Sequence, residues 1–264
     1  MKGKKYRISM AFLNLVGFLA VVIINYLATT LPLNNKGTGE LSDQYPNLFV
    51  PSGLTFSIWG AIYILLAIYV VYQLIVAFKA NPGDKSFIEK IGILFFVSCV
   101  FNSGWIFAWH YEIVWLSLIL MLGLLGSLLA IYLRLNIGKS DENNKIKGMV
   151  HIPFSVYLGW ITIATIANVT ALLVYLGWNR FGLSEQFWTI LVLAVGIIIA
   201  LAMLFLRNDI FYNLVVLWSF LGILLKRLGD KATPALFVII LTGIGMAVIT
   251  IGIIVQAVRR KQLY

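Results

Sequence analysis

The side chains best suited to binding chemistry in this chain are amides and indoles inside apolar stretches. Trp160 and Asn168 are eight residues apart within an apolar run. At about 100° per residue, this spacing puts them about 80° apart on a helix, with Ala164 on the same side. An amide in hydrocarbon has no water to bond, so it must find a protein partner or line a cavity.

Two further stretches also pair an aromatic side chain with a polar group. Asn102, Trp105 and Trp109 fall within about 60° of one another on a helix, and Trp59 lies one turn before Tyr63. A flat apolar ligand needs aromatic faces for stacking and a few polar groups to fix its orientation. Three such faces therefore predict a shared intramembrane pocket for a ligand of this shape.

Each of these residues has a predicted role in the pocket. The stacking faces would come from Trp59, Trp105, Trp109 and Trp160. The polar contacts would come from Tyr63, Asn102 and Asn168, while Gly104 and Ala164 would leave room for the ligand.

Tryptophan and asparagine also occur in membrane helices for purely structural reasons. Tryptophan gathers at membrane interfaces without binding a ligand, which could account for the residues near predicted span ends, Trp109, Trp115, Trp178 and Trp188. Intramembrane asparagine often only bonds a neighbouring helix. We expect this structural role for Asn14 and Asn25, and it is the alternative for Asn102 and Asn168.

The elements that must position these side chains are membrane-spanning helices. The chain has 264 residues, of which 61% are hydrophobic and 11% charged, and long apolar runs recur from end to end. This composition predicts an all-α, polytopic transmembrane bundle. We expect eight spans, at about 8–32, 54–78, 89–109, 112–134, 150–176, 187–206, 210–227 and 234–257.

The separators between spans are short and polar. Pro82, Gly83 and Asp84 divide the second span from the third, and Pro234 begins the last helix. The break at 207–209 is only three residues long, so spans six and seven should form a tight hairpin. The connection from about 33 to 53 is longer, which is typical of a lid, although a plain surface loop is the alternative.

The distribution of basic residues predicts the orientation. With the N-terminus in the cytoplasm, fifteen of the 20 Lys and Arg residues fall on the inner side, so both termini should be cytoplasmic. These residues occur in short clusters between spans, and the net charge of +10 therefore does not indicate nucleic-acid binding. The membrane lipid bilayer is the expected environment.

The sequence gives little support for a catalytic site or a metal site. Cys99 is the only cysteine and has apolar neighbours, which predicts an inert buried thiol. His110 and His151 show no metal-ligand spacing. Glu112 and Asp209 lie at predicted turns without a carboxylate partner. We expect a protein that is not an enzyme, contains no metal and requires no cofactor.

Three motifs in order resemble the tryptophan-rich sensory protein family, also called TspO/MBR or translocator protein. The run LFVPSGLTFSIWGAIY at 48–63 is similar to the start of that family's second helix, with Trp59 and Tyr63 in place. The run FNSGWIF at 101–107 resembles the third helix, and GWITIATIAN at 159–168 resembles the fifth. The resemblance covers about 1–178 and implies a five-helix ligand-binding bundle.

The chain also departs from the family pattern. Pro51 is followed by Ser52 where the family has two prolines, and Pro153 lies seven positions ahead of Trp160. About three further spans follow, so we divide the chain into a TspO-like unit, 1–178, and a transmembrane extension, 179–264. The family's dimer implies a homodimer here, although the extension could cover that surface.

The resemblance implies binding of porphyrins or other tetrapyrroles, and a role as sensor or regulator in a bacterial cell membrane. Some members are reported to degrade porphyrin, in which case the indoles of Trp59 or Trp160 would donate electrons to a photoexcited ligand. Two alternatives remain, a membrane transporter of such ligands and a structural partner in a membrane complex. The middle of every predicted span lacks Asp, Glu, Lys and Arg, which argues against ion-coupled transport.

Overall fold

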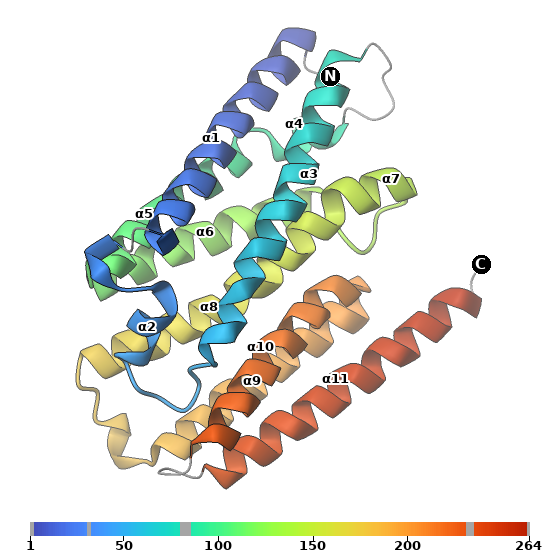
Figure 1. Cartoon of the computed structure of the whole chain (residues 1–264). Coiled ribbons are helices and arrows are strands. Elements are labelled where there is room, and N and C mark those ends of the chain that lie inside the picture. Colours follow the sequence, from blue (N-terminus) through green and yellow to red (C-terminus); the bar gives the residue numbers. More distant parts are fainter. Residues whose placement is uncertain (1–2, 31–32, 80–85, 231–234, 263–264) are drawn as a thin grey trace.

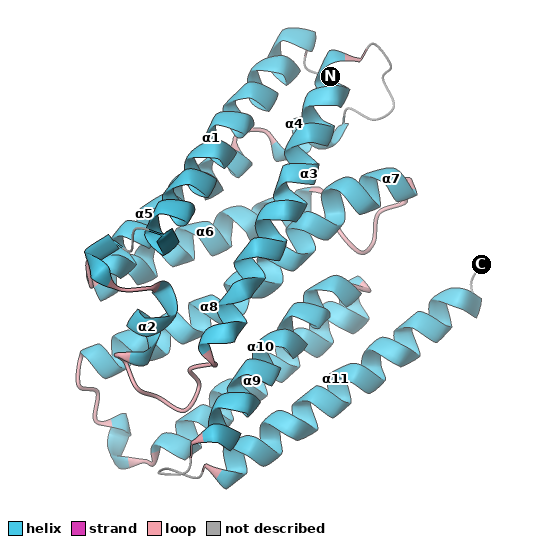
Figure 2. Cartoon of the chain, viewed as in Figure 1, coloured by secondary structure: helices cyan, strands magenta, loops and turns pink. Residues whose placement is uncertain are grey.

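The computed structural model describes residues 3–30, 33–79, 86–230 and 235–262, and within these ranges the regular elements are helices (Figure 2). Seven of the helices are long and apolar enough to cross a membrane, and an eighth is a shorter apolar helix of 17 residues, Leu94–His110. The predicted all-α membrane bundle is therefore confirmed. The expected breaks at 82–84 and at Pro234 lie outside the described residues.

The helices follow the predicted order of spans. The long ones are α1 (Lys4–Thr30), α3 (Ile58–Phe78), α5 (Leu94–His110), α6 (Val114–Arg134), α8 (Ile152–Tyr175), α9 (Glu185–Arg207), α10 (Ile210–Gly229) and α11 (Leu236–Gln262). The short ones are α2 (Thr38–Asp43), α4 (Ser86–Ile91), α7 (Asn144–Ile146) and the turns η1 (Leu33–Asn35), η2 (Gly53–Ser57), η3 (Lys147–His151) and η4 (Arg180–Gly182).

The predicted third span, 89–109, is interrupted near its start. Gly92 has a φ of +53°, a conformation that residues with a side chain rarely adopt, and it separates α4 from α5. The 17 residues of α5 reach only about 25 Å at 1.5 Å per residue. The sequence pattern missed this break because Gly92 lies inside an otherwise apolar run.

A π-turn leads into α8, and Pro153 explains it. The proline lacks an N–H, and its ring clashes with the carbonyl four residues earlier, so the regular ladder cannot continue through this point. The π-helical turn η3 precedes it, and α8 then begins with Pro153 in its first turn.

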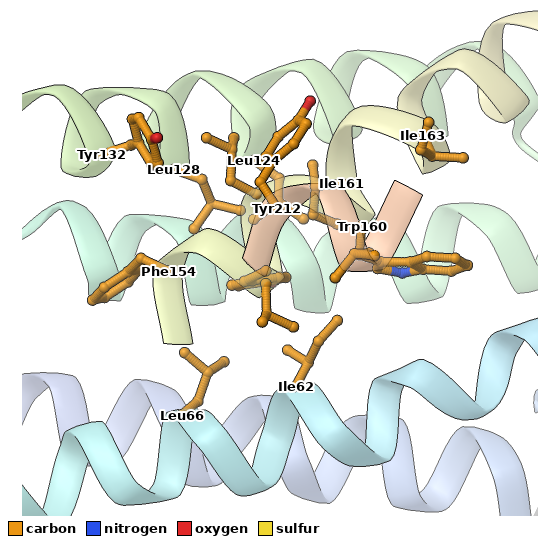
Figure 3. Packing of buried hydrophobic residues seen from close by; sticks show 14 of the residues in the cluster. Ile62, Leu66, Leu124, Leu128, Tyr132, Phe154, Trp160, Ile161, Ile163 and Tyr212 are labelled. Atoms are coloured by element: carbon orange, nitrogen blue, oxygen red, sulfur yellow. The ribbon is translucent and has the colours of Figure 1, made fainter. Parts of the chain in front are cut away.

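The α8 helix lies at the centre of the bundle (Figure 1). It packs against α6, α3 and α10, and α10 in turn packs against α9 and α11. Figure 3 shows Phe154, Trp160 and Ile161 of α8 between the aliphatic side chains of α6 and α3. The Trp/Asn pair on this helix is thus packed against protein, with Trp160 and Asn168 each 3% exposed.

The tight hairpin at 207–209 is confirmed. Arg207 ends α9, and Asn208 adopts a left-handed conformation. Asp209 then caps α10 by accepting a hydrogen bond from the backbone N–H of Tyr212 at 3.1 Å. One left-handed residue followed by a capping carboxylate is enough to reverse the chain here.

Candidate functional site

The aromatic residues predicted on three spans meet in one cluster centred on Trp59. Its ring stacks on Tyr63 at a centroid distance of 5.6 Å and lies 6.2 Å from the ring of Trp105. The ring of Trp160 stands edge-on to Trp59 at 6.1 Å. Trp109 stacks on Trp105 at 6.0 Å and extends the cluster. We call these five residues the tryptophan cage; they come from α3, α5 and α8, as the periodicity predicts.

A small cavity of about 40 Å³ lies beside the cage, against Trp105, Trp109 and Trp160. Its lining is Ser42, Pro51, Phe56, Trp105, Trp109, Trp160, Ile163, Ala164, Ala167 and Asn168. Five of the eight predicted site residues are among them, while Trp59, Tyr63 and Asn102 are not. A space of this size has room for a few water molecules, whereas small-molecule sites typically measure about 300–1,000 Å³.

The polar groups of the cavity wall differ in how well they are bonded. Asn168 donates from Nδ2 to Ser117 Oγ at 3.0 Å, and its Oδ1 accepts the Trp105 Nε1–H at 3.4 Å. The indole N–H of Trp160 is buried and has no hydrogen-bond partner among the described residues. A buried indole N–H normally finds a partner, so Trp160 departs from the usual pattern.

Asn102 has a supporting position behind the cage. Its Nδ2 donates to the hydroxyl of Tyr157 at 2.7 Å, and its Oδ1 accepts from Asn25 Nδ2 at 3.0 Å. This chain of bonds joins α1, α5 and α8. Asn14 likewise donates to Gln73 at 3.3 Å, so the structural role expected for Asn14 and Asn25 is confirmed.

The interfacial alternative applies to only some of the tryptophans. Trp109 is 6% exposed and donates its indole N–H to the Thr38 carbonyl at 3.3 Å, so it belongs to the cage rather than to a lipid-facing belt. Trp115 is 55% exposed, as a residue of the belt should be. Burial of the side chain separates these two otherwise similar sequence positions.

The long connection before α3 covers the cavity. We call residues 33–57 the cap; they include α2 and the turns η1 and η2. Phe56 of the cap stands edge-on to Trp160 at 5.8 Å, and the ring of Tyr45 lies 5.7 Å from Trp109. Burial, together with the nearby Glu112 carboxylate, raises the pKa of Tyr45 and so further favours the neutral phenol.

The three-helix extension holds the cap from the other side. Glu185 accepts the Leu48 N–H at 2.8 Å, and the carbonyl of Gly222 accepts the Ser52 N–H at 3.0 Å. The indole of Trp218 donates to the Thr55 carbonyl at 2.9 Å. Lys226 also pairs with Asp43. The cap is therefore fixed between the cage and the extension.

Glycine at 222 is required by this contact. A Cβ at this position would overlap the side chain of Thr55, so only glycine lets the cap backbone approach α10 this closely. Thr55 itself is 1% exposed. The close fit makes the cap part of the folded core rather than a loose surface loop.

The sequence patterns missed several contributors to the site. Phe56 lies in the same run as Trp59, and Tyr157 lies one helical turn before Trp160, so a search for aromatics at helical spacing could have found both. Ser117 carries no local signal, because its role depends on the packing of α6 against α8.

The acidic residues are engaged elsewhere. Glu112 pairs with Lys36 of the cap. Asp209 accepts hydrogen bonds from Tyr132 at 2.9 Å and from Ser155 at 2.5 Å. Among the residues that the structure describes, there is no group of three or more His, Cys, Asp or Glu side chains suited to a metal ion. Cys99 is buried at 6% exposure, as expected.

The described residues form a polytopic bundle with seven helices long and apolar enough to cross a membrane, which defines an integral membrane protein. A family model described as TSPO-like protein matches residues 11–255, and the chain belongs to this family. The match continues through α9 and α10 and into α11, beyond the segment in which the three motifs occur. Comparisons with curated proteins and with solved structures found no match.

Proposed function

We propose that the protein binds a porphyrin or a similar flat tetrapyrrole in the tryptophan cage, as a sensor or regulator in its membrane. The observation that carries this proposal is Trp160, a residue that lines an aromatic cavity and whose buried indole N–H has no hydrogen-bond partner among the described residues. The family assignment supports a TspO-type membrane protein. It leaves the ligand and the role to be tested.

The cage residues would have distinct tasks with such a ligand. Trp105 and Trp109 offer parallel faces, and a stacked aromatic contributes about 0.5–1.5 kcal/mol beyond area burial. The Trp160 N–H would donate to a polar edge group of the ligand. Asn168, held by Ser117, would fix the orientation of that edge.

The cap must move before a tetrapyrrole can enter. The cavity of about 40 Å³ is roughly tenfold smaller than a typical small-molecule site. Ser42, Pro51 and Phe56 of the cap form one side of it, so displacement of the cap is the simplest way to enlarge the space. Ligand binding would then be coupled to cap opening, because the ligand binds only the conformation in which the cap is displaced.

A titration with protoporphyrin tests the proposal. The shift of the porphyrin absorption band is followed rather than tryptophan emission, because the variants themselves remove an indole. A Trp160→Phe, Asn168→Ala double variant should raise Kd by at least about tenfold, since two buried hydrogen-bonding groups contribute about 1 kcal/mol each. Trp115→Phe, which changes an exposed indole outside the cage, is the matched control. An unchanged Kd in the double variant would refute the assigned site.

A measurement of porphyrin flux across a membrane distinguishes a transporter from a sensor. Proteoliposomes containing the protein should take up no more porphyrin than empty vesicles if the protein only senses the ligand. Uptake that is abolished by the cage variant would assign a transporter instead.

A further inference from the structure

A second, larger cavity lies outside the cage, in a groove between α8 and α9. Its volume is about 650 Å³, within the range of small-molecule sites. Its walls are aliphatic, with Ile166, Val169 and Leu173 on α8 and Leu191, Val192 and Val195 on α9. Val169 and Val195 are 37% and 44% exposed, so the groove is open along its length to the hydrocarbon of the bilayer.

One end of the groove is polar and lies where α8 ends and α9 begins. Arg180 and Glu185 form an ion pair there at 3.5 Å, and their side chains are 47% and 38% exposed. The indole of Trp188 donates to the Arg180 carbonyl at 2.9 Å, and the Trp178 and Trp188 rings lie 4.8 Å apart. Tryptophans beside a charged pair at helix ends are typical of the headgroup level of a membrane.

We propose that this groove is a binding site for a zwitterionic phospholipid, with one acyl chain between α8 and α9 and the headgroup over the Arg180–Glu185 pair. A phosphate matches the Arg180 guanidinium, and a headgroup ammonium matches the Glu185 carboxylate. An anionic lipid without an ammonium group would leave Glu185 facing negative charge. The aliphatic walls of the groove match an apolar acyl chain.

The cap forms part of the groove as well as of the cage. Pro46, Asn47 and Phe49 lie at the groove, and Glu185 also accepts the Leu48 N–H at 2.8 Å. A lipid chain in the groove would therefore pack against the same segment that closes the cage. The site depends on α9 and on no residue of the cage, so it stands independently of porphyrin binding.

Native mass spectrometry after reconstitution in nanodiscs tests this site. The nanodiscs contain equal amounts of phosphatidylethanolamine and phosphatidylglycerol. After the protein is released from the nanodisc in the mass spectrometer, the lipids that remain bound to it are counted and identified. The wild-type protein should retain one phosphatidylethanolamine. Val195→Phe, which fills the groove, should reduce that occupancy about tenfold, and Val169→Phe should do the same from the opposite wall.

Two controls make the outcome decisive. Val71→Phe changes a 56% exposed valine on α3, away from the groove, and should leave lipid retention unchanged. Glu185→Gln should keep the contact with the acyl chain but remove the preference for phosphatidylethanolamine, because the headgroup ammonium then loses its carboxylate partner. The proposal is overturned if the Val195, Val169 and Val71 variants retain equal amounts of lipid, or if the wild type retains both lipids equally. Either result would mean that the retained lipid is only surrounding bilayer lipid.

Discussion

The five-helix unit and the three-helix extension have similarly apolar spans, but they use their buried polar groups differently. In the unit, mid-span amides bond other helices: Asn102 reaches Tyr157, and Asn168 reaches Ser117. In the extension, buried hydroxyls bond their own helix, as Ser219 does with the Val215 carbonyl. Directional bonds therefore fix the helices around the cage, whereas the mid-span contacts among α9, α10 and α11 depend on shape, as at Gly196, Gly245 and Gly252.

The extension makes most of its directional contacts with the unit through α10 and the turn before it. The part of α10 from its middle to its C-terminal end holds the cap, through Trp218, Gly222 and Lys226. At the other end Asp209 bonds Tyr132 of α6 and Ser155 of α8. The unit thus builds the candidate site, while the extension fixes the segment that closes it.

The largest expected effect comes from removal of the Asp209 carboxylate, which joins the two regions. In Asp209→Ala the hydroxyls of Tyr132 and Ser155 lose a charged acceptor, and the first turn of α10 loses its cap. We expect a loss on the order of 3 kcal/mol in the free energy of unfolding. Denaturant titration of the detergent-solubilised protein measures it. Asp141→Ala, at an exposed position, is the control, and equal stability of the two variants would contradict the role of Asp209.

A pair of glycines tests the packing of the same junction. Gly138 and Gly177 both have positive φ, of +83° and +63°. A Cβ at Gly138 would overlap the Arg207 carbonyl oxygen, whereas a Cβ at Gly177 would meet no atom within 4 Å. Both alanine variants carry the backbone strain, so their difference isolates the contact between the unit and the extension.

We expect Gly138→Ala to lower the free energy of unfolding by about 2 kcal/mol more than Gly177→Ala, because overpacking costs about 1–3 kcal/mol. Thermal unfolding in one detergent compares the two directly. Equal melting temperatures would mean that the chain near Gly138 adjusts freely and that the junction is not tightly packed.

The smallest expected effect comes from weakening the contact between α10 and the cap. Trp218→Phe removes the indole N–H that bonds the Thr55 carbonyl at 2.9 Å, and a bond of this kind contributes about 1 kcal/mol. Hydrogen–deuterium exchange at the Ser52 amide should then be about fivefold faster, because that amide bonds Gly222 on the same helix. Trp115→Phe should leave the exchange unchanged. Unchanged exchange in Trp218→Phe would mean that the Trp218 bond does not hold the cap.

Much of the fold and part of the site could be predicted from local patterns. Apolar runs located the helices, and the three residues at 207–209 predicted the tight hairpin. Helical spacing grouped Trp105, Trp109, Trp160, Ala164 and Asn168, which all line the cavity. The break at Gly92 was missed, because one glycine in an apolar run does not show by itself whether a helix ends there.

Hydrophobicity and helical period are local properties, so the sequence alone was enough to establish a membrane bundle and the helix faces that carry indoles and amides. The hold of α10 on the cap emerged only from the packed structure: Trp218 and Thr55 are 163 positions apart, and no periodicity links residues so distant. The small size of the cavity has the same origin, because the space left inside a bundle depends on how side chains from several helices pack together.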